Sequence, residues 1–546
     1  MTRPPLIQQY AGVSSLTRCL VKAWMRSAPA TYSAAALLFK GAEKNLRLRR
    51  STPQRAQRLT SSLLGTVPAY GEPLSRLRRF LLSNLSFLTL LDVSQKIQSR
   101  ALSPVEVTKA ELDRIAALDP KLKSYATVMA DSAMAQAKQA EVEIGRGEVK
   151  GPLHGVPVAV KDLCWTTSAP TAAGMTIHKD YMPSEDATVV KRLSDAGAII
   201  LGKLQLTESA YADHHPNVTP PRNPWNADAW PGASSSGSGV ATAAGLCYGS
   251  LGSDTGGSIR FPSAANGVTG LKRTWGRVSR YGVFELAASL DHIGPMARSA
   301  ADCGAILGII AGEDPKDTTT LPGGPSDYLA ALNDGIRGLR IGYDPLWAET
   351  AVDEQTVAVA KAARETLASL GATIVEIKAP DSTVVLADWI PNCAIETAVA
   401  HEQTYPSRKS EYGPALSGLI ETGRALTALD YQKILLRRAE FKGAVAHMFQ
   451  SIDLLLVPAQ SFAAPSLADM AMLGQSNDMI SRLLRFTCPF DSSGNPTITM
   501  PGGFTALGLP IGFQLVGPHL SEALLVRAGA AFQSATDWNR RHPDLN

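Results

Sequence analysis

One stretch of 31 residues restricts the fold of this chain more than any other part. It runs from Gly232 to Pro262 and reads GASSSGSGVATAAGLCYGSLGSDTGGSIRFP, with two clusters of serine and glycine separated by small, helix-compatible residues. Glycine permits positive φ and lets main-chain N–H groups come close to a ligand. A loop of such N–H groups stabilises developing negative charge. We therefore expect the rest of the chain to be a scaffold that holds this loop against one upstream lysine.

From about residue 90 onward, helical patterns alternate with short apolar runs. The expected strands are 155–160, 198–201, 268–271, 339–343, 373–377, 454–457, 497–500 and 510–516. The expected helices are 92–100, 103–117, 131–145, 187–196, 300–311, 352–370, 429–449 and 522–535. This alternation indicates an α/β fold with helices on both faces of a sheet. Residues 312–335 and 460–485 are loop-rich and are candidates for surface connections or a substrate cap.

Charge divides the chain into a basic leader and an acidic body. Residues 1–90 contain 14 Lys and Arg but only Glu43 and Glu72 as acids, whereas the remainder contains 39 basic and 47 acidic residues. An acidic body does not fit a nucleic-acid-binding core, so no nucleic-acid partner is expected. We expect an N-terminal extension over 1–89, a catalytic domain over 90–540 and a short tail over 541–546. The leader has three competing interpretations: a targeting segment, a basic or membrane-surface tail, or an appendage without a catalytic role.

The cysteines and histidines argue against a disulfide framework and against a metal site. The six cysteines are widely spread and form no CxxC pair, which favours a reducing, cytoplasmic location. There is no HExxH motif, and the one adjacent pair, His214 and His215, precedes a proline in a polar stretch. No run of 18 or more apolar residues is present, so no stable membrane span is expected. The sequence predicts no metal and no other cofactor.

Two common catalytic motifs are excluded by their details. Gly197 to Lys203 fits the GxxxxGK pattern of a phosphate loop, but Leu204 follows where a magnesium-binding Ser or Thr is required. The residues between are also an apolar strand rather than a loop. No GxSxG is present, which disfavours the serine elbow of the α/β-hydrolases.

Lys161 and Ser258 remain as a candidate base and nucleophile. A serine hydroxyl is a weak nucleophile until a neighbouring base takes its proton. Lys161 follows an apolar run that predicts a buried strand, and burial lowers the pKa of a lysine by disfavouring its charged form. The competing interpretation of a lone lysine is an exposed surface charge.

Ser258 lies in a loop suited to binding an oxyanion. Gly256 and Gly257 precede it and leave the main-chain N–H groups unobstructed. Taken alone, either Ser/Gly cluster could also be a turn or a flexible linker. Asp254 and Arg260 flank the loop, and we interpret them as a charge pair that fixes its shape, the alternative being ordinary surface charges.

These residues resemble the amidase signature family. The resemblance is carried by Lys161-Asp162, the GASSSGSG run and Gly252–Pro262, with steps of 73 residues from Lys161 to Ser234 and 24 from Ser234 to Ser258. It covers roughly residues 90–540 and implies a single large mixed β-sheet covered by helices on both faces. Ala233 and Arg273 depart from the family pattern, where Gly and Pro are usual.

The resemblance implies a Ser-Ser-Lys triad of Lys161, Ser234 and Ser258. Ser258 would be the nucleophile, and Ser234 would pass protons between it and neutral Lys161. An acyl-enzyme on Ser258 would then be hydrolysed by water. The implied oxyanion donors are the backbone N–H groups of Thr255, Gly256, Gly257 and Ser258.

The implied function is hydrolysis of small aryl or alkyl amides, with carbamates or esters as further candidates. The alternative is the glutaminase subunit of a tRNA-dependent amidotransferase, and a third is a binding protein without catalysis. The acyl pocket is not encoded in the motifs, and the candidates Tyr211, Trp389 and Phe486 could equally be ordinary core. The expected partner is a small-molecule amide substrate, and a homodimer is compatible with the sequence.

Overall fold

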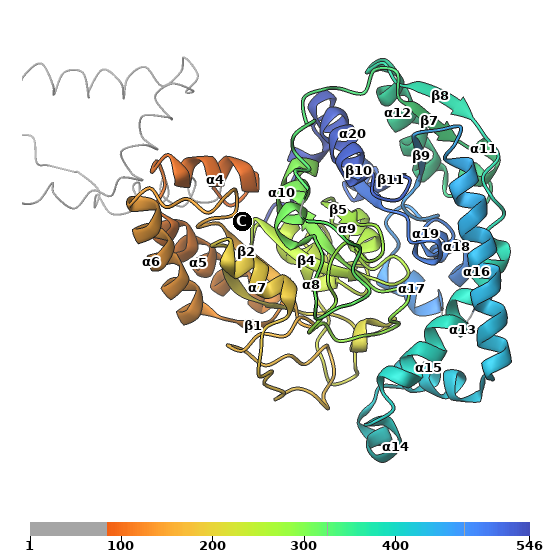
Figure 1. Ribbon diagram of the computed structural model, residues 1–546, viewed down its shortest axis with the longest axis horizontal. Coiled ribbons are helices and arrows are strands. Elements are labelled where there is room, and N and C mark those ends of the chain that lie inside the picture. The colour runs from red at the N-terminus through yellow and green to blue at the C-terminus, as the bar shows by residue number, and fades with distance from the viewer. Residues whose placement is uncertain (1–84, 325, 474–475, 546) are drawn as a thin grey trace, which may run out of the picture.

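Eleven strands of the described residues form one mixed β-sheet. The structure is a computed structural model and describes residues 85–324, 326–473 and 476–545. The spatial order of the strands is β1-β3-β2-β4-β6-β5-β10-β11-β9-β7-β8 (Figure 1). Their bounds are β1 Tyr125–Val128, β2 Pro157–Lys161, β3 Ile199–Leu204, β4 Gly249–Asp254, β5 Thr269–Lys272, β6 His292–Ala297, β7 Arg340–Tyr343, β8 Thr373–Glu376, β9 Leu454–Pro458, β10 Thr497–Phe504 and β11 Pro510–Val516. The single mixed sheet confirms the expected fold class.

The strand β2 lies between two parallel neighbours, β3 and β4. Ala159 pairs with Ser250 and Val160 with Leu251, and all five residues of β2 are buried. A strand covered on both faces needs an unbroken apolar run, which is what this segment supplies. Because parallel strands end at the same edge of a sheet, Lys161 at the end of β2 lies beside the loop that follows β4.

Helices cover both faces of this sheet. Their bounds are α4 Leu90–Gln98, α5 Pro104–Leu122, α6 Ala130–Gly145, α7 Thr188–Asp195, α8 Ser236–Ala243, α9 Arg260–Asn266, α10 Ala300–Ile310, α11 Pro345–Glu349, α12 Glu354–Ser369, α13 Thr383–Ala400, α14 Tyr405–Arg408, α15 Pro414–Ala425, α16 Ala428–Met448, α17 Leu467–Leu473, α18 Asn477–Leu484, α19 Cys488–Ser493 and α20 Glu522–Ala535. Successive side chains of a strand point to opposite faces. In β4, a Cβ at Gly249 would meet Ile306 of α10, whereas Ser250 Oγ contacts Thr242 Oγ1 of α8 at 2.9 Å. The helices α8 and α10 therefore lie on opposite faces.

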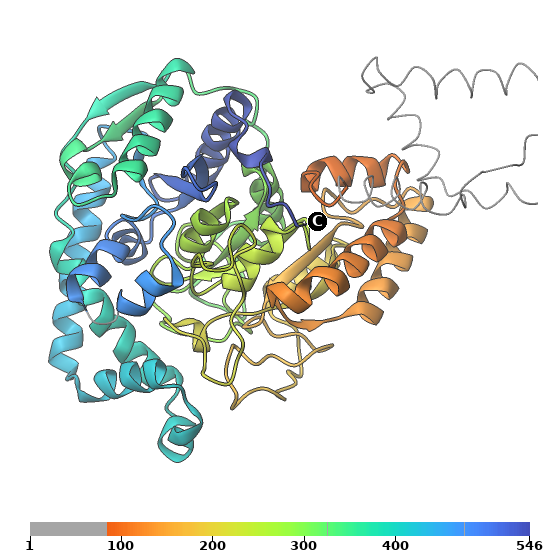
Figure 2. The same ribbon diagram turned by 180° about the vertical axis from the view of Figure 1, so that it is seen from behind.

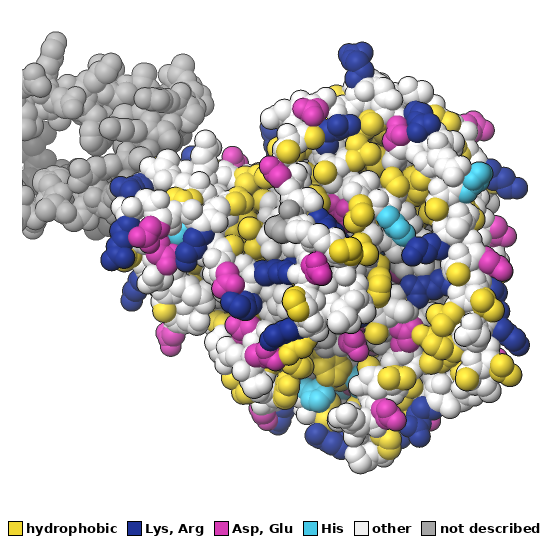
Figure 3. Space-filling model, in the orientation of Figure 1, with side chains coloured by type: hydrophobic (Ala, Val, Ile, Leu, Met, Phe, Trp, Pro, Cys, Tyr) yellow, Lys and Arg dark blue, Asp and Glu magenta, His cyan; other side chains and the backbone are white. Residues whose placement is uncertain are grey.

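The two ends of the sheet carry different helical layers. The helices α5 and α6 pack on each other beside β3, while α13, α15 and α16 form a layer at the far end (Figures 1 and 2). This second layer matters for function because α13 carries Trp389 toward the loop after β4. Basic and acidic side chains are interspersed on the face shown in Figure 3.

The structure contains elements that local patterns did not predict. β4 reads GSLGSD and β6 reads HIGPMA, and both lie in the middle of the sheet although Gly, Ser and Pro are poor strand formers. Small residues are required here, because a Cβ at Gly252 would lie 3.0 Å from Ser235 Oγ. The stretch 460–485, expected as loop, contains α17 and α18.

The described cysteines are Cys164, Cys247, Cys303, Cys393 and Cys488, and each is a buried free thiol. Cys19 and the leader lie outside the described residues. Within those residues, no helix is both long enough and apolar enough to cross a membrane.

The packing of α15 on α13 gives a test of the fold. A Cβ at Gly423 would lie 1.9 Å from the carbonyl oxygen of Ala394 in α13, whereas a Cβ at Gly418 on the same helix meets nothing within 4 Å. Gly423→Ala should destabilise the protein by about 1–3 kcal/mol, because the added methyl group forces the two helices apart. Gly418→Ala is the matched control and should stabilise by up to about 1 kcal/mol through helix propensity. Thermal unfolding of both variants measures this, and equal midpoints would contradict the packing.

Candidate active site

Lys161 lies at the end of β2 with its side chain fully shielded from solvent. Its Nζ donates hydrogen bonds to three serine hydroxyls: Ser234 at 2.8 Å, Ser235 at 3.0 Å and Ser253 at 2.7 Å. Ser234 and Ser235 come from the run before α8, and Ser253 comes from β4. The three hydroxyls replace the water that a surface lysine would bind.

Burial lowers the pKa of Lys161 to about 7, because the charged form loses its hydration. The nearby groups Cys164, Asp254 and Asp291 oppose this shift and do not cancel it. A large fraction of the amine is thus neutral near pH 7 and can accept a proton.

The hydroxyl network indicates which serine gives Lys161 a proton. A neutral amine has two hydrogens and one lone pair, so one of its three partners must donate to Nζ. Ser235 Oγ donates to the carbonyl oxygen of Ser253 at 3.1 Å, so its hydrogen is already used. Ser234 and Ser253 are left as the hydroxyls able to donate. Sequence patterns missed the Ser253 contact, which depends on the parallel pairing of β2 with β4.

Ser258 lies in the turn between β4 and α9 and is partly exposed, whereas Ser234 is fully buried. Its backbone oxygen accepts a hydrogen bond from the Ser235 amide at 3.3 Å, which ties the two serine clusters together. The structure brings Lys161 and Ser234 into contact. Within the described chain, the Ser258 hydroxyl forms no hydrogen bond.

The carboxylate of Asp254 organises the glycine loop from inside. It accepts the amide of Gly257 at 2.6 Å and the amide of Ile259 at 2.9 Å. The Gly257 amide, assigned from the sequence to the oxyanion hole, is therefore engaged. The amides of Thr255, Gly256 and Ser258 donate to no other group of residues 85–324, 326–473 and 476–545.

Asp254 and Arg260 form a buried ion pair. The Nε and Nη2 atoms of Arg260 donate to the two carboxylate oxygens at 3.0 and 2.8 Å. Burial alone would raise the pKa of Asp254, but the guanidinium lowers it to about 2. The carboxylate is thus charged at any working pH and holds the loop in one shape.

Trp389 packs directly on the glycine loop. Its Nε1 donates to the carbonyl oxygen of Thr255 at 2.9 Å, and a Cβ at Gly256 would lie 2.3 Å from its ring. Phe486 is different, because it is fully buried and packs on Trp347 with ring centroids 5.2 Å apart. A side chain closed in the core does not line a pocket, so the sequence assignment of Phe486 to the substrate pocket is not supported.

Two hollows lie near Lys161. A small cavity that Ser253 borders has walls from Leu163, Ala210, Phe284 and Ile293. Phe284 also lines a surface hollow of about 390 Å³ that includes Trp165 and the loop of Tyr281. Tyr211 follows Ala210 and is partly buried.

The GxxxxGK match is explained by the fold. Gly197 to Lys203 leads into and through β3, and Lys203 Nζ pairs with Asp162 Oδ1 at 3.0 Å, both side chains being buried. This lysine holds the residue next to Lys161. Among the described residues, no group of three or more His, Cys, Asp or Glu side chains is placed to hold a metal ion.

Comparisons with known proteins point in one direction. Residues 106–526 match the family model described as Amidase. The Mycobacterium tuberculosis protein AmiD, whose name places it among the amidases, is 49% identical over 84% of this chain and 97% of its own length. A glutamyl-tRNA(Gln) amidotransferase subunit from Chloroflexus aggregans is 36% identical over 85% of this chain and 99% of its own. The solved peptide amidase from Stenotrophomonas maltophilia is similar with a TM-score of 0.72 and 29% identity, covering 84% of this chain and 98% of that one.

The burial of Lys161 gives a test by pH. Between about pH 7 and its unfolded value, the unfolded chain binds the Lys161 proton and the folded chain does not, so unfolding becomes harder as pH rises. The free energy of unfolding of the wild type, minus that of Lys161→Met, should therefore grow by about 3 kcal/mol from pH 7 to 9.5. Urea unfolding at the two pH values measures the difference. A pH-independent difference would show that Lys161 titrates as it does in the unfolded chain.

Proposed function

The chain belongs to the amidase signature family and is a hydrolase of amide C–N bonds, and we propose that it works through a Ser-Ser-Lys relay with an acyl-enzyme on Ser258. The observation that carries the proposal is the 2.8 Å hydrogen bond between the buried Lys161 Nζ and Ser234 Oγ, beside a glycine loop that presents Ser258. A depressed lysine pKa supplies the base that a serine nucleophile needs.

Each proton in the proposed cycle has a place to go. Ser258 Oγ attacks the carbonyl carbon of the amide while its proton moves to Ser234 Oγ, and the Ser234 proton moves to Lys161 Nζ. The tetrahedral oxyanion accepts hydrogen bonds from the amides of Thr255, Gly256 and Ser258. The C–N bond then breaks, and the amine leaves with the proton returned through Ser234. Water attacks the Ser258 ester by the same relay and releases the acid.

The proposed substrates are small aryl or alkyl amides, with carbamates and esters as further candidates. The support is the lining of the two hollows, where Leu163, Ala210, Phe284 and Trp165 are apolar or aromatic. Such walls bind an apolar group and leave few polar contacts for a charged one. Tyr211, next to Ala210, remains a proposed pocket residue, while Trp389 is proposed to border the pocket through the loop it packs on.

The second candidate is the glutaminase subunit of an amidotransferase. It is favoured by the relatives of that name, at 36% identity over nearly their whole length. The stand-alone amidase is preferred because similarity to AmiD is higher, at 49%. An amidotransferase component would need its partner chains and glutamine for turnover.

A panel of purified variants tests the assignment. The wild type should hydrolyse at least one member of a set of anilides, aliphatic amides, carbamates and esters without any partner chain. Ser258→Ala and Lys161→Ala should each lower kcat by at least about 10³-fold, because they remove the nucleophile and the base. Ser94→Ala, a buried serine of α4 remote from the site, is the matched control. Full activity of Ser258→Ala would exclude the mechanism, and turnover of glutamine alone, only with added partners, would favour the second candidate.

We also propose that residues 90–540 are the whole catalytic unit, because the family match begins at residue 106 and ends at 526. Deletion of residues 1–80 should leave kcat/KM for the best substrate of the panel within about twofold, as expected for an appendage outside the core. Steady-state kinetics and a thermal midpoint of the truncated protein measure this. Loss of folding would show that the leader belongs to the domain.

A further inference from the structure

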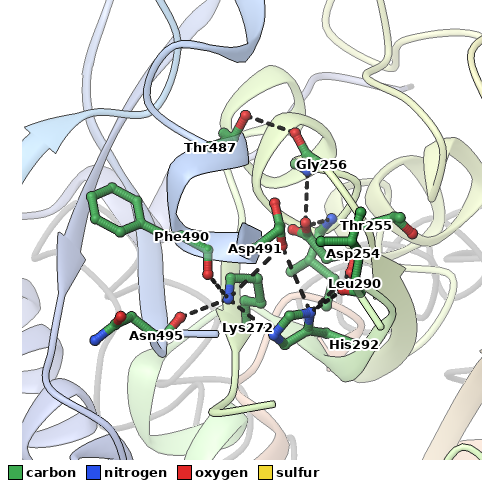
Figure 4. Close-up of polar contacts among 12 residues, drawn as sticks. Asp254, Thr255, Gly256, Lys272, Leu290, His292, Thr487, Phe490, Asp491 and Asn495 are labelled. Carbon is green, nitrogen blue, oxygen red and sulfur yellow. Dashed lines mark hydrogen bonds and ion pairs between the residues drawn. The ribbon is translucent and has the colours of Figure 1, made fainter. Parts of the chain in front are cut away.

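The short helix α19 and the residue before it lie behind the glycine loop, although they come more than 200 residues later in the chain. Thr487 Oγ1 donates to the carbonyl oxygen of Gly256 at 2.7 Å (Figure 4). The Thr487 carbonyl oxygen accepts Nη1 of Arg260 at 2.8 Å, and Asp491 Oδ2 accepts Nη2 of Arg260 at 2.5 Å. The catalytic loop is thus held on its rear side by a segment that the proposed reaction does not use.

Asp491 is fully buried and serves two sets of partners. One oxygen binds Arg260, while the other, Oδ1, lies 3.9 Å from Lys272 Nζ and 3.7 Å from His292 Nδ1. Within the described chain Oδ1 accepts no hydrogen bond. A buried carboxylate with one free oxygen is costly, so its retention here needs a reason beyond packing.

Lys272 fixes α19 to the sheet. It is the last residue of β5, and its Nζ donates to the carbonyl oxygens of Phe490 at 3.1 Å and Asn495 at 2.6 Å. His292 donates Nδ1–H to the carbonyl oxygen of Leu290 at 2.6 Å, so its Nε2 is free to accept from Lys272 Nζ at 3.3 Å. Asp491 is therefore carried on a rigid support rather than on a mobile loop (Figure 4).

We propose that Asp491 is a positioning residue for the oxyanion loop, acting through Arg260 and Asp254. With Asp491 in place, the guanidinium is held on two sides, by Asp254 in front and Asp491 behind. Asp254 is then held where it binds the amides of Gly257 and Ile259. Those two amides turn inward, and the amides of Thr255, Gly256 and Ser258 are left for the substrate oxyanion. This inference rests on the proposed acyl-enzyme mechanism.

Charge balance explains why a carboxylate stands at this position. The buried cluster contains the cations Arg260 and Lys272 and the carboxylates Asp254 and Asp491, two of each sign. Removing one carboxylate leaves a buried positive charge, which destabilises the arrangement. Burial lowers the pKa of Lys272 to about 7, so this lysine can lose its proton when Asp491 is neutralised. A neutral side chain that keeps an oxygen for Arg260 should therefore be tolerated better than an apolar one.

Asp491→Asn and Asp491→Leu separate these two contributions. Asparagine keeps an acceptor oxygen for Arg260, and leucine of similar size removes both charge and acceptor. Asp302→Asn is the matched control, because Asp302 is a fully buried aspartate of α10 whose carboxylate binds the amide of Leu91, away from the loop. All variants are assayed with the best substrate of the panel, and each thermal midpoint is recorded.

The decisive readout is a transition-state analogue. A trifluoromethyl ketone with the acyl group of that substrate reacts with Ser258 Oγ to form a tetrahedral oxyanion and reports on the loop directly. Asp491→Leu should lower kcat by about 10²-fold with KM within about twofold, and should raise the Ki of the ketone in parallel. Asp491→Asn should lose about tenfold or less in both quantities. Asp302→Asn should change neither, whatever its effect on the thermal midpoint.

The outcomes distinguish the inference from the function on which it rests. A folded Asp491→Leu with unchanged kcat and Ki, or with KM alone altered, overturns the positioning role. If the leucine variant does not fold, Asp491→Asn decides: a parallel change of kcat and Ki supports the role, and wild-type values overturn it. Ser258→Ala is assayed beside them. If it remains active, the proposed mechanism itself fails, whereas an inactive Ser258→Ala with wild-type-like Asp491 variants rejects this inference alone.

Discussion

The rest of the structure depends on burying one amine, that of Lys161, without leaving it unpartnered. Three serine hydroxyls surround its Nζ, and hydroxyls suit this place because they accept from an ammonium and donate to an amine. The partners come from two separate segments, so the amine also joins the end of β2 to β4 and to the run before α8. The glycines and serines of these segments let the backbones approach closely enough for all three contacts.

Behind this amine lies a second buried cluster, in which charges are paired rather than neutralised. The pKa of Asp254 falls to about 2 beside Arg260, whereas burial raises that of Asp491 to about 8 although Arg260 opposes the shift. The two carboxylates share one guanidinium but differ in how many donors they accept. Asp254 binds amides of the catalytic loop, and Asp491 binds α19 to it. The loop is thus a rigid piece between a helix and a sheet.

Local patterns predict part of this arrangement and tertiary contacts supply the rest. Lys161 could be found because an apolar run marks β2 and because the serine and glycine clusters are contiguous. β4 could not, since its small residues are selected by close packing and not by strand propensity. The use of the Gly257 amide by Asp254 depends on loop geometry that no spacing reveals. Aromatic content does not separate pocket from core, which is why the sequence does not place Phe486 correctly, and Asp491 is brought to the site only by the fold of the C-terminal third.

The distance in sequence between the loop and its support has a consequence for how the protein comes into being. Gly256 and Thr487 are 231 residues apart, and Trp389 joins the loop from between them. A growing chain that has emerged only as far as α10 already contains Lys161 and all the serines. It lacks the segments that hold the loop from the side and from behind. Catalytic competence is therefore acquired late in synthesis, and a chain cut short before α19 carries every reacting group without a site.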